Sequence, residues 1–399
     1  MDESAFSQIY IFSRSVKDFR TGNHLLYSST SIIFMALVGI LCGATGWEEI
    51  ELVCQNKKEV LKKYLSDEFT GVPSHDCFRY FFLLIPPQSL ESSFRTFMGN
   101  VKRPERPVIA VDGKTQKGAS SMGKWTGEAS KLHMISAFVT ELGISIGQIA
   151  VGKKANEIVE IPNLLDDLDV KGGIITVDAL GCQKDIARKV IEKKADYIFK
   201  VKDNQKFLLK GIQEGCEKQI GKRLSCYQTA SESSAGHSRE EERHCFMCNF
   251  TAWLPKCGKE WPGIRTFGCI TTTVKNLTTN KVTTEKQYFI SSLELNARLA
   301  MESIRKHWNI ENNLHWQLDV SFREDSIRMD RKAMMNLSVL NKLALPFLKM
   351  YPEKMSIKRK MMAAAMNDQV LDQLLNGARS EEHTSELQSH QLSRMPSSA

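Results

Sequence analysis

A change of periodicity near residue 107 constrains the fold of this chain more than any other feature. Between residues 108 and 201, short apolar runs rich in Ile and Val alternate with amphipathic segments of helical period. In order, the pattern predicts three strands, a helix, a strand, a helix and a strand. The predicted strands are VIAVDG, HMISAFVT, ISIGQIAV, GIITVDAL and DYIFKVK. Three leading strands followed by strand–helix–strand units predict an α/β fold with a ribonuclease-H-like sheet.

The segments on either side of this block predict further modules. Residues 1–101 carry apolar residues at three- and four-residue spacings, which predicts a helical module interrupted by a breaker region, FTGVPSHDCFRYFF. The sequence VKRPERP indicates a linker, so we place the domain boundary at 102–107. Residues 107–378 are predicted to form the second domain. Within it, a β-rich insertion with little helical period covers about 203–287, and helices resume from 297 to about 375.

The last 21 residues differ from the rest in composition. From Arg379 the sequence RSEEHTSELQSH loses all hydrophobic periodicity and looks like the translation of a sequencing adapter, an artefact tail over 379–399; the alternative is a genuine polar, disordered tail. This segment holds two arginines and three glutamates, so the net charge outside it is +9, against +8 for all 399 residues. A basic excess indicates a polyanionic partner.

Neither a membrane span nor a disulfide framework is predicted. The longest apolar stretch, Ile32 to Ala44, has 13 residues, fewer than the ~20 that a membrane-spanning helix needs, so we expect a buried helix and no membrane partner. Ten scattered cysteines without a secretory signal predict reduced thiols in a cytosol. Zinc is not expected, because only one of the two candidate pairs has the C-x2-C spacing. Those pairs are Cys245 with Cys248 and Cys257 with Cys269.

Three acidic residues stand out by their positions. Asp112 is predicted to end the first strand and Asp178 the fourth, at the same edge of adjacent strands. Glu311 lies in the helical segment IRKHWNIENNLHWQLDVSF. Carboxylates are the ligands that Mg²⁺ prefers, and a pair of metal ions can clamp the attacking and leaving oxygens of a phosphodiester displacement. The alternative for each aspartate is a turn or cap residue, which is common at a strand end.

Several blocks of the chain, in register from about Asp18 to Gly377, together resemble the ISAs-type insertion-sequence transposases and the H repeat-associated proteins of the DDE superfamily. The blocks are VIAVDGKTQKG, HMISAF, KANEIVEIPNLLDDLDVKGGIITVDALGCQKDIA, DYIFKVKDNQ, HSREEER, YFISSL and IRKHWNIENNLHWQLDVSFREDSIRMD. The resemblance implies a ribonuclease-H-like catalytic core with a β insertion before the helix of the catalytic Glu. The catalytic and metal-binding triad would correspond to Asp112, Asp178 and Glu311.

The same resemblance implies an activity and its partners. A member of this family would cleave DNA and transfer the strand, which moves an insertion sequence, with Mg²⁺ as cofactor and Mn²⁺ as a substitute. Its partners would be the element ends and the target DNA, bound by a homodimer in a synaptic complex in the bacterial cytoplasm at the nucleoid. The alternatives are a stranded or inactive element product that acts as a nuclease, or a DNA-binding protein without catalysis. The intact triad argues against the last of these.

Five basic residues are candidates for contacts with DNA. They are Lys114, Arg239, Arg243, Arg305 and Lys306. Lys114 follows Asp112 by two residues, and Gly113 between them would let the backbone approach a phosphate. Arg239 and Arg243 alternate along a predicted strand, and arginine suits phosphate, although an ion-paired sheet face is the common alternative. Arg305 and Lys306 precede Glu311 in the same helical segment.

The segment around Glu311 departs from a pattern common in transposases with a β insertion, Y-x2-R-x3-E-x6-K. Those three slots hold Ile304, His307 and Leu318. His307, Glu311 and His315 recur at four-residue spacing and would share one helix face, where the histidines would bind DNA, orient Glu311 or pack. Asp319 lies about two turns past Glu311 at ~3.6 residues per turn, so it is a rival ligand on roughly the same face.

The helical module contains one clear basic cluster. Its members are Lys57, Lys58, Lys62 and Lys63. A solvated helix face explains this cluster as well as a DNA contact does, so we expect the module on its own to bind DNA poorly.

Overall fold

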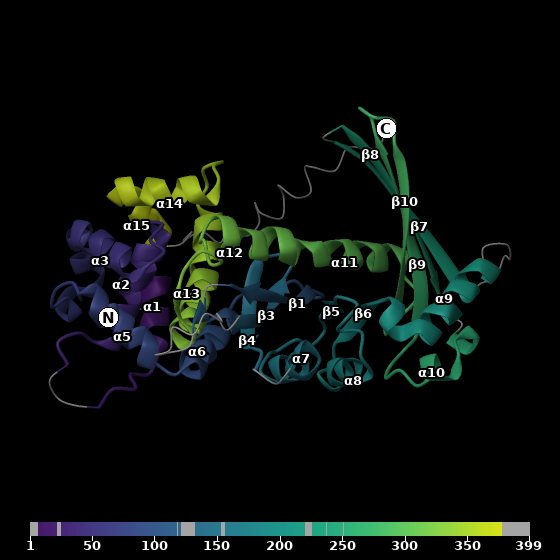
Figure 1. The fold of residues 1–399 in the computed structure, drawn as a ribbon, viewed down its shortest axis with the longest axis horizontal. Coiled ribbons are helices and arrows are strands. Elements are labelled where there is room, and N and C mark those ends of the chain that lie inside the picture. The colour runs from purple at the N-terminus through teal and green to yellow at the C-terminus, as the bar shows by residue number, and fades with distance from the viewer. Residues whose placement is uncertain are drawn as a thin grey trace. The chain divides into compact units, whose positions relative to one another are not determined.

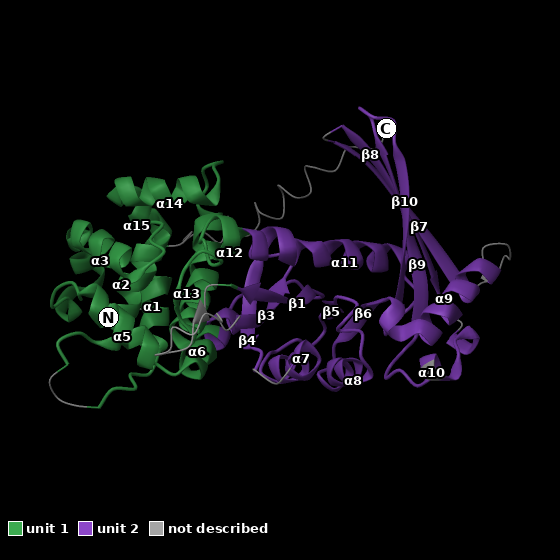
Figure 2. Cartoon of the chain, viewed as in Figure 1, with its two compact units in different colours: residues 1–94, 117–131, 317–399 green, residues 95–116, 132–316 purple. Residues whose placement is uncertain are grey.

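The computed structural model describes residues 7–21, 25–117, 119–120, 132–152, 156–219, 226–236, 238–249 and 251–376. The chain forms two compact units (Figure 2). Unit 1 comprises residues 1–94, 117–131 and 317–399, and unit 2 comprises residues 95–116 and 132–316. The predicted tail, 379–399, lies outside the described residues.

Unit 1 is helical. Its N-terminal helices are α1 (Gln8–Ser15), α2 (Ser29–Leu41), α3 (Trp47–Asn56), α4 (Lys58–Leu65), α5 (His75–Leu84) and most of α6 (Pro87–Gly99). Its C-terminal helices are most of α12 (Trp316–Val320), with α13 (Arg331–Met350), α14 (Ile357–Met366) and α15 (Asp368–Asn376). Every residue of α2 is buried, and α1, α3, α13, α14 and α15 all contact it. No described helix is both long and apolar enough to span a bilayer.

Both ends of the chain therefore contribute to the core of unit 1. The predicted basic cluster lies at this junction: Lys57 Nζ is 2.6 Å from Asp368 Oδ1, and Lys63 Nζ is 2.5 Å from Asp372 Oδ2. In addition, the buried Asn336 amide on α13 donates hydrogen bonds to the carbonyl oxygens at the end of α5. Lys57, which is buried, and Lys63 are thus ion-paired with α15, and a contact of the cluster with DNA stays a prediction.

One predicted breaker region contains a helix. Helix α5 begins at His75, inside the stretch FTGVPSHDCFRYFF, because the Ser74 side chain accepts a hydrogen bond from the Cys77 amide and caps the first turn. Phe78, Phe81 and Phe82 lie on the buried face of α5. Gly71 and Pro73 interrupt the helical pattern, and the helix begins two residues after Pro73.

Unit 2 is built on a nine-stranded sheet of order β4-β3-β1-β5-β6-β10-β9-β8-β7 (Figure 1). Its first five strands are β1 (Val108–Gln116), β3 (Leu132–Val139), β4 (Ile144–Ala150), β5 (Ile174–Val177) and β6 (Asp196–Val201). β1, β3 and β4 pair antiparallel, while β5 is parallel to β1 and β6 is parallel to β5. This order and these directions confirm the predicted ribonuclease-H-like α/β core.

Helices cover both faces of this core (Figure 1). α7 (Glu157–Asp166) and α8 (Lys184–Glu192) lie on one face, and α11 (Ala297–Ile310) crosses the other. Val108, Ile174 and Ile198, from three adjacent strands, pack with Ala300 and Ile304 of α11 in one apolar cluster. Residues at even positions of β1, β5 and β6 therefore face α11.

The remaining strands extend the same sheet. β7 (Tyr227–Gly236), β8 (Arg239–Cys248), β9 (Thr266–Asn276) and β10 (Val282–Ser291) form an antiparallel ribbon whose last strand pairs with β6. The insertion is β-rich as predicted, but it opens with a helix, α9 (Lys206–Gln219), and holds a short one, α10 (Lys256–Lys259). Two glycines in α9 weaken its apolar period in the sequence. A Cβ at Gly211 would lie 2.2 Å from Pro255 Cδ, so close packing requires glycine there.

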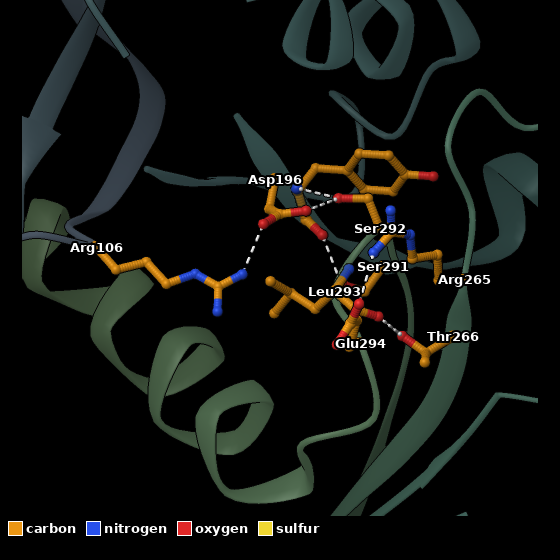
Figure 3. Close-up of polar contacts among 9 residues, drawn as sticks. Arg106, Asp196, Arg265, Thr266, Ser291, Ser292, Leu293 and Glu294 are labelled. Atoms are coloured by element: carbon orange, nitrogen blue, oxygen red, sulfur yellow. Dashed lines mark hydrogen bonds and ion pairs between the residues drawn. The ribbon is translucent and has the colours of Figure 1, made fainter. Parts of the chain in front are cut away.

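Polar contacts tie the insertion to the core (Figure 3). The Ser292 hydroxyl donates to Asp196 Oδ1 and accepts from the Tyr197 amide, while the Ser291 hydroxyl donates to the Tyr197 carbonyl. Arg106, before β1, pairs with the other oxygen of Asp196 at 2.7 Å. The seam between β6 and β10 is thus held by side chains as well as by backbone pairing.

Candidate active site

Asp112 and Asp178 lie side by side in the sheet. The parallel pairing of β1 with β5 ends at Val111 opposite Val177, so Asp112 is the next residue of β1 and Asp178 is the first residue after β5. The predicted adjacency is confirmed. The prediction that Asp112 ends its strand is wrong, because β1 continues to Gln116 by pairing with β3, and only its pairing with β5 stops at Val111.

Glu311 is brought to this edge by the helix on the α11 side of the sheet. At Glu311 the α-helix gives way to a π-helical segment, Glu311–His315, before α12 begins. Such wide turns are rare and frequently occur at functional sites. The segment turns His315 toward the acids: its Nδ1 lies 3.6 Å from Asp112 Oδ2 and 3.5 Å from Glu311 Oε2.

Asp112, Glu311 and His315 form a compact set of potential metal ligands. One ligand atom from each lies within 4.8 Å of the other two. Asp178 is outside this set, although its negative charge contributes to raising the pKa of Asp112. The structure therefore brings together two members of the predicted triad and adds a histidine, while the third member is at the neighbouring strand position.

The electrostatics of the two carboxyl groups are opposed. Burial is the main cause that raises the pKa of Asp112 to about 8, and the neighbouring Glu311 carboxylate adds to the shift. A hydrogen bond from His315 is the main cause that lowers the pKa of Glu311. In the absence of a cation, Asp112 therefore holds a proton beside an ionised Glu311.

This donor set fits a divalent cation. A cation would replace the proton between the two carboxyl groups and favour the ionised form of Asp112. His315 is buried, and its Nε2 has no hydrogen-bond partner in the described part of the chain. Two carboxylates with one imidazole suit Mn²⁺ as well as Mg²⁺, because Mn²⁺ accepts both oxygen and nitrogen ligands.

His307 has a different role from His315. Its Nδ1 is 2.9 Å from the hydroxyl of Thr176, a buried pair that joins α11 to β5 two residues before Asp178. Burial lowers the pKa of His307 to about 4, so its ring is neutral near pH 7 and is a poor partner for phosphate. Of the three predicted roles, the structure favours the packing and orientation of the helix that carries Glu311.

Behind Asp112, a pair that the sequence analysis missed explains the adjacent glycine. His133 Nε2 contacts Glu157 Oε1, and His133 Nδ1 is 2.8 Å from the Thr115 hydroxyl. A Cβ on Gly113 would lie 2.4 Å from that Glu157 oxygen and 2.5 Å from His133 Nε2. The lack of a side chain at Gly113 therefore makes room for the His133–Glu157 pair. Nothing in the local pattern links residues 113, 133 and 157.

Gly113→Ala is accordingly expected to destabilise the protein by about 1 kcal/mol, because the new methyl group displaces the side-chain ends of His133 and Glu157 from their contact. Denaturant unfolding of the variant against wild type measures the effect. Gly236→Ala is the matched control, since a Cβ there meets no atom within 4 Å. Equal stabilities of the two variants would contradict the proposed packing.

The predicted DNA-binding residues fall into two groups. Arg305 is ion-paired with Glu232, and Lys306 Nζ lies 3.1 Å from Glu141 Oε1. Glu141 also accepts the Val108 amide, so Lys306 braces α11 against the start of β1. These contacts engage both residues in holding α11.

The other three candidates lie on β1 and β8. Lys114 is on the same face of β1 as Asp112, with a buried ammonium nitrogen. Arg243 pairs with Glu241, whereas Arg239 is exposed at the outer end of the ribbon. The contact of these side chains with DNA stays a prediction.

Burial explains the unusual residues at the three family slots. Ile304 and Leu318 are 4% and 1% exposed, and His307 is 7% exposed, so all three are interior positions. Asp319 belongs to unit 1, and its role as a rival ligand stays a prediction.

The cysteines do not resemble a zinc site where the structure describes them. Cys245 and Cys248 are three residues apart on β8, so their side chains point to opposite faces of the sheet. Burial raises the pKa of the Cys245 thiol to about 12, which disfavours the thiolate that zinc requires. The side chain of Cys257 lies outside the described residues.

Two family models match the chain. Residues 103–344 match the model described as "Transposase DDE domain", and residues 11–98 match the model described as "DDE_Tnp_1-associated". The two matches meet near the boundary predicted from the sequence VKRPERP.

Whole-chain relatives agree with these matches. "Putative protein YbfL" and "H repeat-associated putative transposase YhhI", both from Escherichia coli K12, are each 34% identical over 91% of this chain and 96% of the relative. "Putative transposase YncI" from Escherichia coli O157:H7 is 34% identical over 90% of this chain and 92% of its own length. A solved piggyBac transposase in a synaptic complex with hairpin DNA aligns over 98% of this chain and 82% of its own, at 12% identity and a TM-score of 0.44. That score is too low to bear on function.

Proposed function

Because the chain belongs to the family of transposases with a DDE domain, we propose that it cleaves DNA at the ends of an insertion sequence and transfers the freed strand to a target. The observation that carries this proposal is the convergence of Asp112 and Glu311, 199 positions apart in the chain, with His315 at one edge of the core sheet. No part of the described chain offers a second group of acidic, His or Cys ligands of this kind.

We propose that Asp112, Asp178 and Glu311 hold divalent metal, with Mg²⁺ as the cofactor and Mn²⁺ as a substitute. When bound, the metal would activate a water oxygen and neutralise charge that develops on the phosphate. Burial raises the pKa of Asp112, and its carboxyl group would lose the proton when a metal ion binds. His315 holds Glu311 ionised, and the His307–Thr176 and Lys306–Glu141 contacts hold the helix over the strands.

The partners of the reaction are also part of the proposal. The substrates are the element ends and the target DNA, both polyanions that suit the net charge of +8. We propose that a homodimer brings two ends together, in the bacterial cytoplasm at the nucleoid. A product that acts only as a nuclease remains the alternative, and strand transfer distinguishes the two.

The test uses the full chain with duplexes that carry the inverted repeats flanking its gene, and a supercoiled plasmid as target. With Mg²⁺ or Mn²⁺ we expect nicks that leave 3′ hydroxyl ends, followed by joining of those ends to the plasmid. EDTA is expected to abolish both steps. Nicking without joining would support the nuclease alternative, and binding without either step would contradict the proposal.

A further inference from the structure

A lysine completes the row of residues that contains the two aspartates. β5 and β6 pair in parallel up to Val177 opposite Phe199, so Lys200 is at the same level of the sheet as Asp178. Asp112, Asp178 and Lys200 therefore occupy equivalent positions on three adjacent strands, all on the face covered by α11. Lys200 was not singled out from the sequence, because its place depends on the pairing of β5 with β6.

The ammonium group of Lys200 is available for a ligand. In the part of the chain that the structure describes, no carboxylate forms an ion pair with it, whereas Arg305 and Lys306 are both ion-paired. Its recorded contact is with Trp308: Nζ lies 5.0 Å from the centre of the indole ring. Trp308 is one helical turn before Glu311, so this pair stands next to the acid centre.

Tryptophans near Glu311 are unusually exposed. Trp308 and Trp316 are 54% and 55% exposed, whereas Trp47 and Trp261 are buried at 9% and 3%. An exposed indole offers a flat face on which a nucleic acid base can stack. Both lie within eight residues on the helical segment that carries Glu311.

The negative charge of the acidic side chains explains why a DNA phosphate needs a positive side chain at the position of Lys200. The acidic side chains of Glu311 and Asp178 disfavour a DNA backbone, so a phosphate that approaches them needs a positive group close by. An ammonium group beside an exposed aromatic face is the combination by which proteins hold a nucleic acid strand, through a phosphate contact and base stacking. A protein partner would have no need of the cation in the acidic row.

We propose that Lys200 and Trp308 form a strand-binding subsite beside the acid centre, in which the Lys200 ammonium binds a phosphate oxygen and the indole of Trp308 stacks on a neighbouring base. The inference rests on the proposed function, because it assigns a DNA strand to the acid centre. It goes further by naming the two residues that hold that strand and the kind of contact each makes.

The test measures DNA binding in EDTA, where cleavage plays no part. The probes are a single-stranded oligonucleotide and a duplex with a single-stranded overhang. Lys200→Met is expected to reduce the slope of log K against log salt concentration by about 0.7, because one phosphate contact to a single strand contributes that amount. Lys200→Arg is expected to keep the slope of the wild type. Trp308→Ala is expected to weaken binding about tenfold, and Trp308→Phe to lose much less.

A similar pair elsewhere in unit 2 provides the control. Lys218 Nζ lies 5.3 Å from the ring centre of Trp253, in the insertion. Lys218→Met and Trp253→Ala are expected to leave affinity and salt dependence unchanged. Indole fluorescence gives a direct signal: DNA is expected to quench it in wild type and in Trp253→Phe, but far less in Trp308→Phe.

The outcomes separate this inference from the proposed function. Unchanged affinity and salt dependence in both Lys200→Met and Trp308→Ala, with a wild type that cleaves, would overturn the subsite and leave the function standing. Loss of binding in these variants, with a wild type that binds but never cleaves, would support the subsite and overturn the proposed catalysis. Lys200→Arg keeps the positive charge and Trp308→Phe keeps an aromatic ring, so retained binding in these two variants would show that a loss in Lys200→Met or Trp308→Ala does not come from misfolding.

Discussion

Asp112→Asn and Glu311→Gln should each lower Mg²⁺-dependent cleavage of element-end DNA by about 1000-fold or more. Metal sites of this type supply several kcal/mol of stabilisation to the transition state, and each 1.4 kcal/mol corresponds to a factor of ten in rate. The same loss is expected for Asp178→Asn, which removes the carboxylate at the neighbouring strand position. Single-turnover rates with a labelled duplex measure the effect.

The variants should keep their fold and their affinity for DNA, since each exchanges an acid for an amide of the same shape. Asp185→Asn is the matched control: this exposed aspartate of α8 pairs with Arg188 on the opposite face of the sheet, and its loss should not change the rate. A near wild-type rate for any of the three site variants would remove that residue from the triad. If Glu311→Gln remained active, Asp319 would become the next candidate.

In metal-free protein, the free energy of unfolding should fall as the pH rises from about 4 to about 8. Asp112 keeps its proton in the folded state up to a pKa of about 8, whereas in the unfolded chain it loses this proton near its ordinary pKa of 3.8. In this pH range the folded state binds one more proton than the unfolded state. The free energy of unfolding therefore falls by at most about 1.4 kcal/mol per pH unit. The lowered pKa of Glu311 acts in the opposite direction, but only where the pH falls below about 4.5.

Urea unfolding in EDTA between pH 5 and pH 8 measures this slope. Asp112→Asn should remove it, whereas Asp185→Asn should retain it. Mg²⁺ should stabilise wild type more at pH 8 than at pH 6. At the lower pH the metal must displace the proton on Asp112, whereas near pH 8 much of the protein has already lost this proton. Equal slopes in wild type and Asp112→Asn would show that the acid pair does not hold a proton in the folded protein.

Sequence alone identified the parts of this protein that depend on local pattern. Short Ile- and Val-rich runs, separated by amphipathic segments, predicted the five core strands and their order along the chain, because the periods of strands and helices depend on neighbouring residues. The adjacency of Asp112 and Asp178 followed from the same pattern, since the ends of parallel strands meet at one edge of the sheet. The apolar period of α9 escaped notice because Gly211 and Gly215 interrupt it.

Only the tertiary structure decided which distant residues meet. The π-helical segment aims His315 at Asp112, the register of β5 and β6 places Lys200 beside Asp178, and Gly113 makes room for the His133–Glu157 pair. Ion pairs engage Arg305 and Lys306, and helices from both ends of the chain share one core. Periodicity cannot reveal these contacts, because they depend on strand register and helix phase between elements that are separate in the chain.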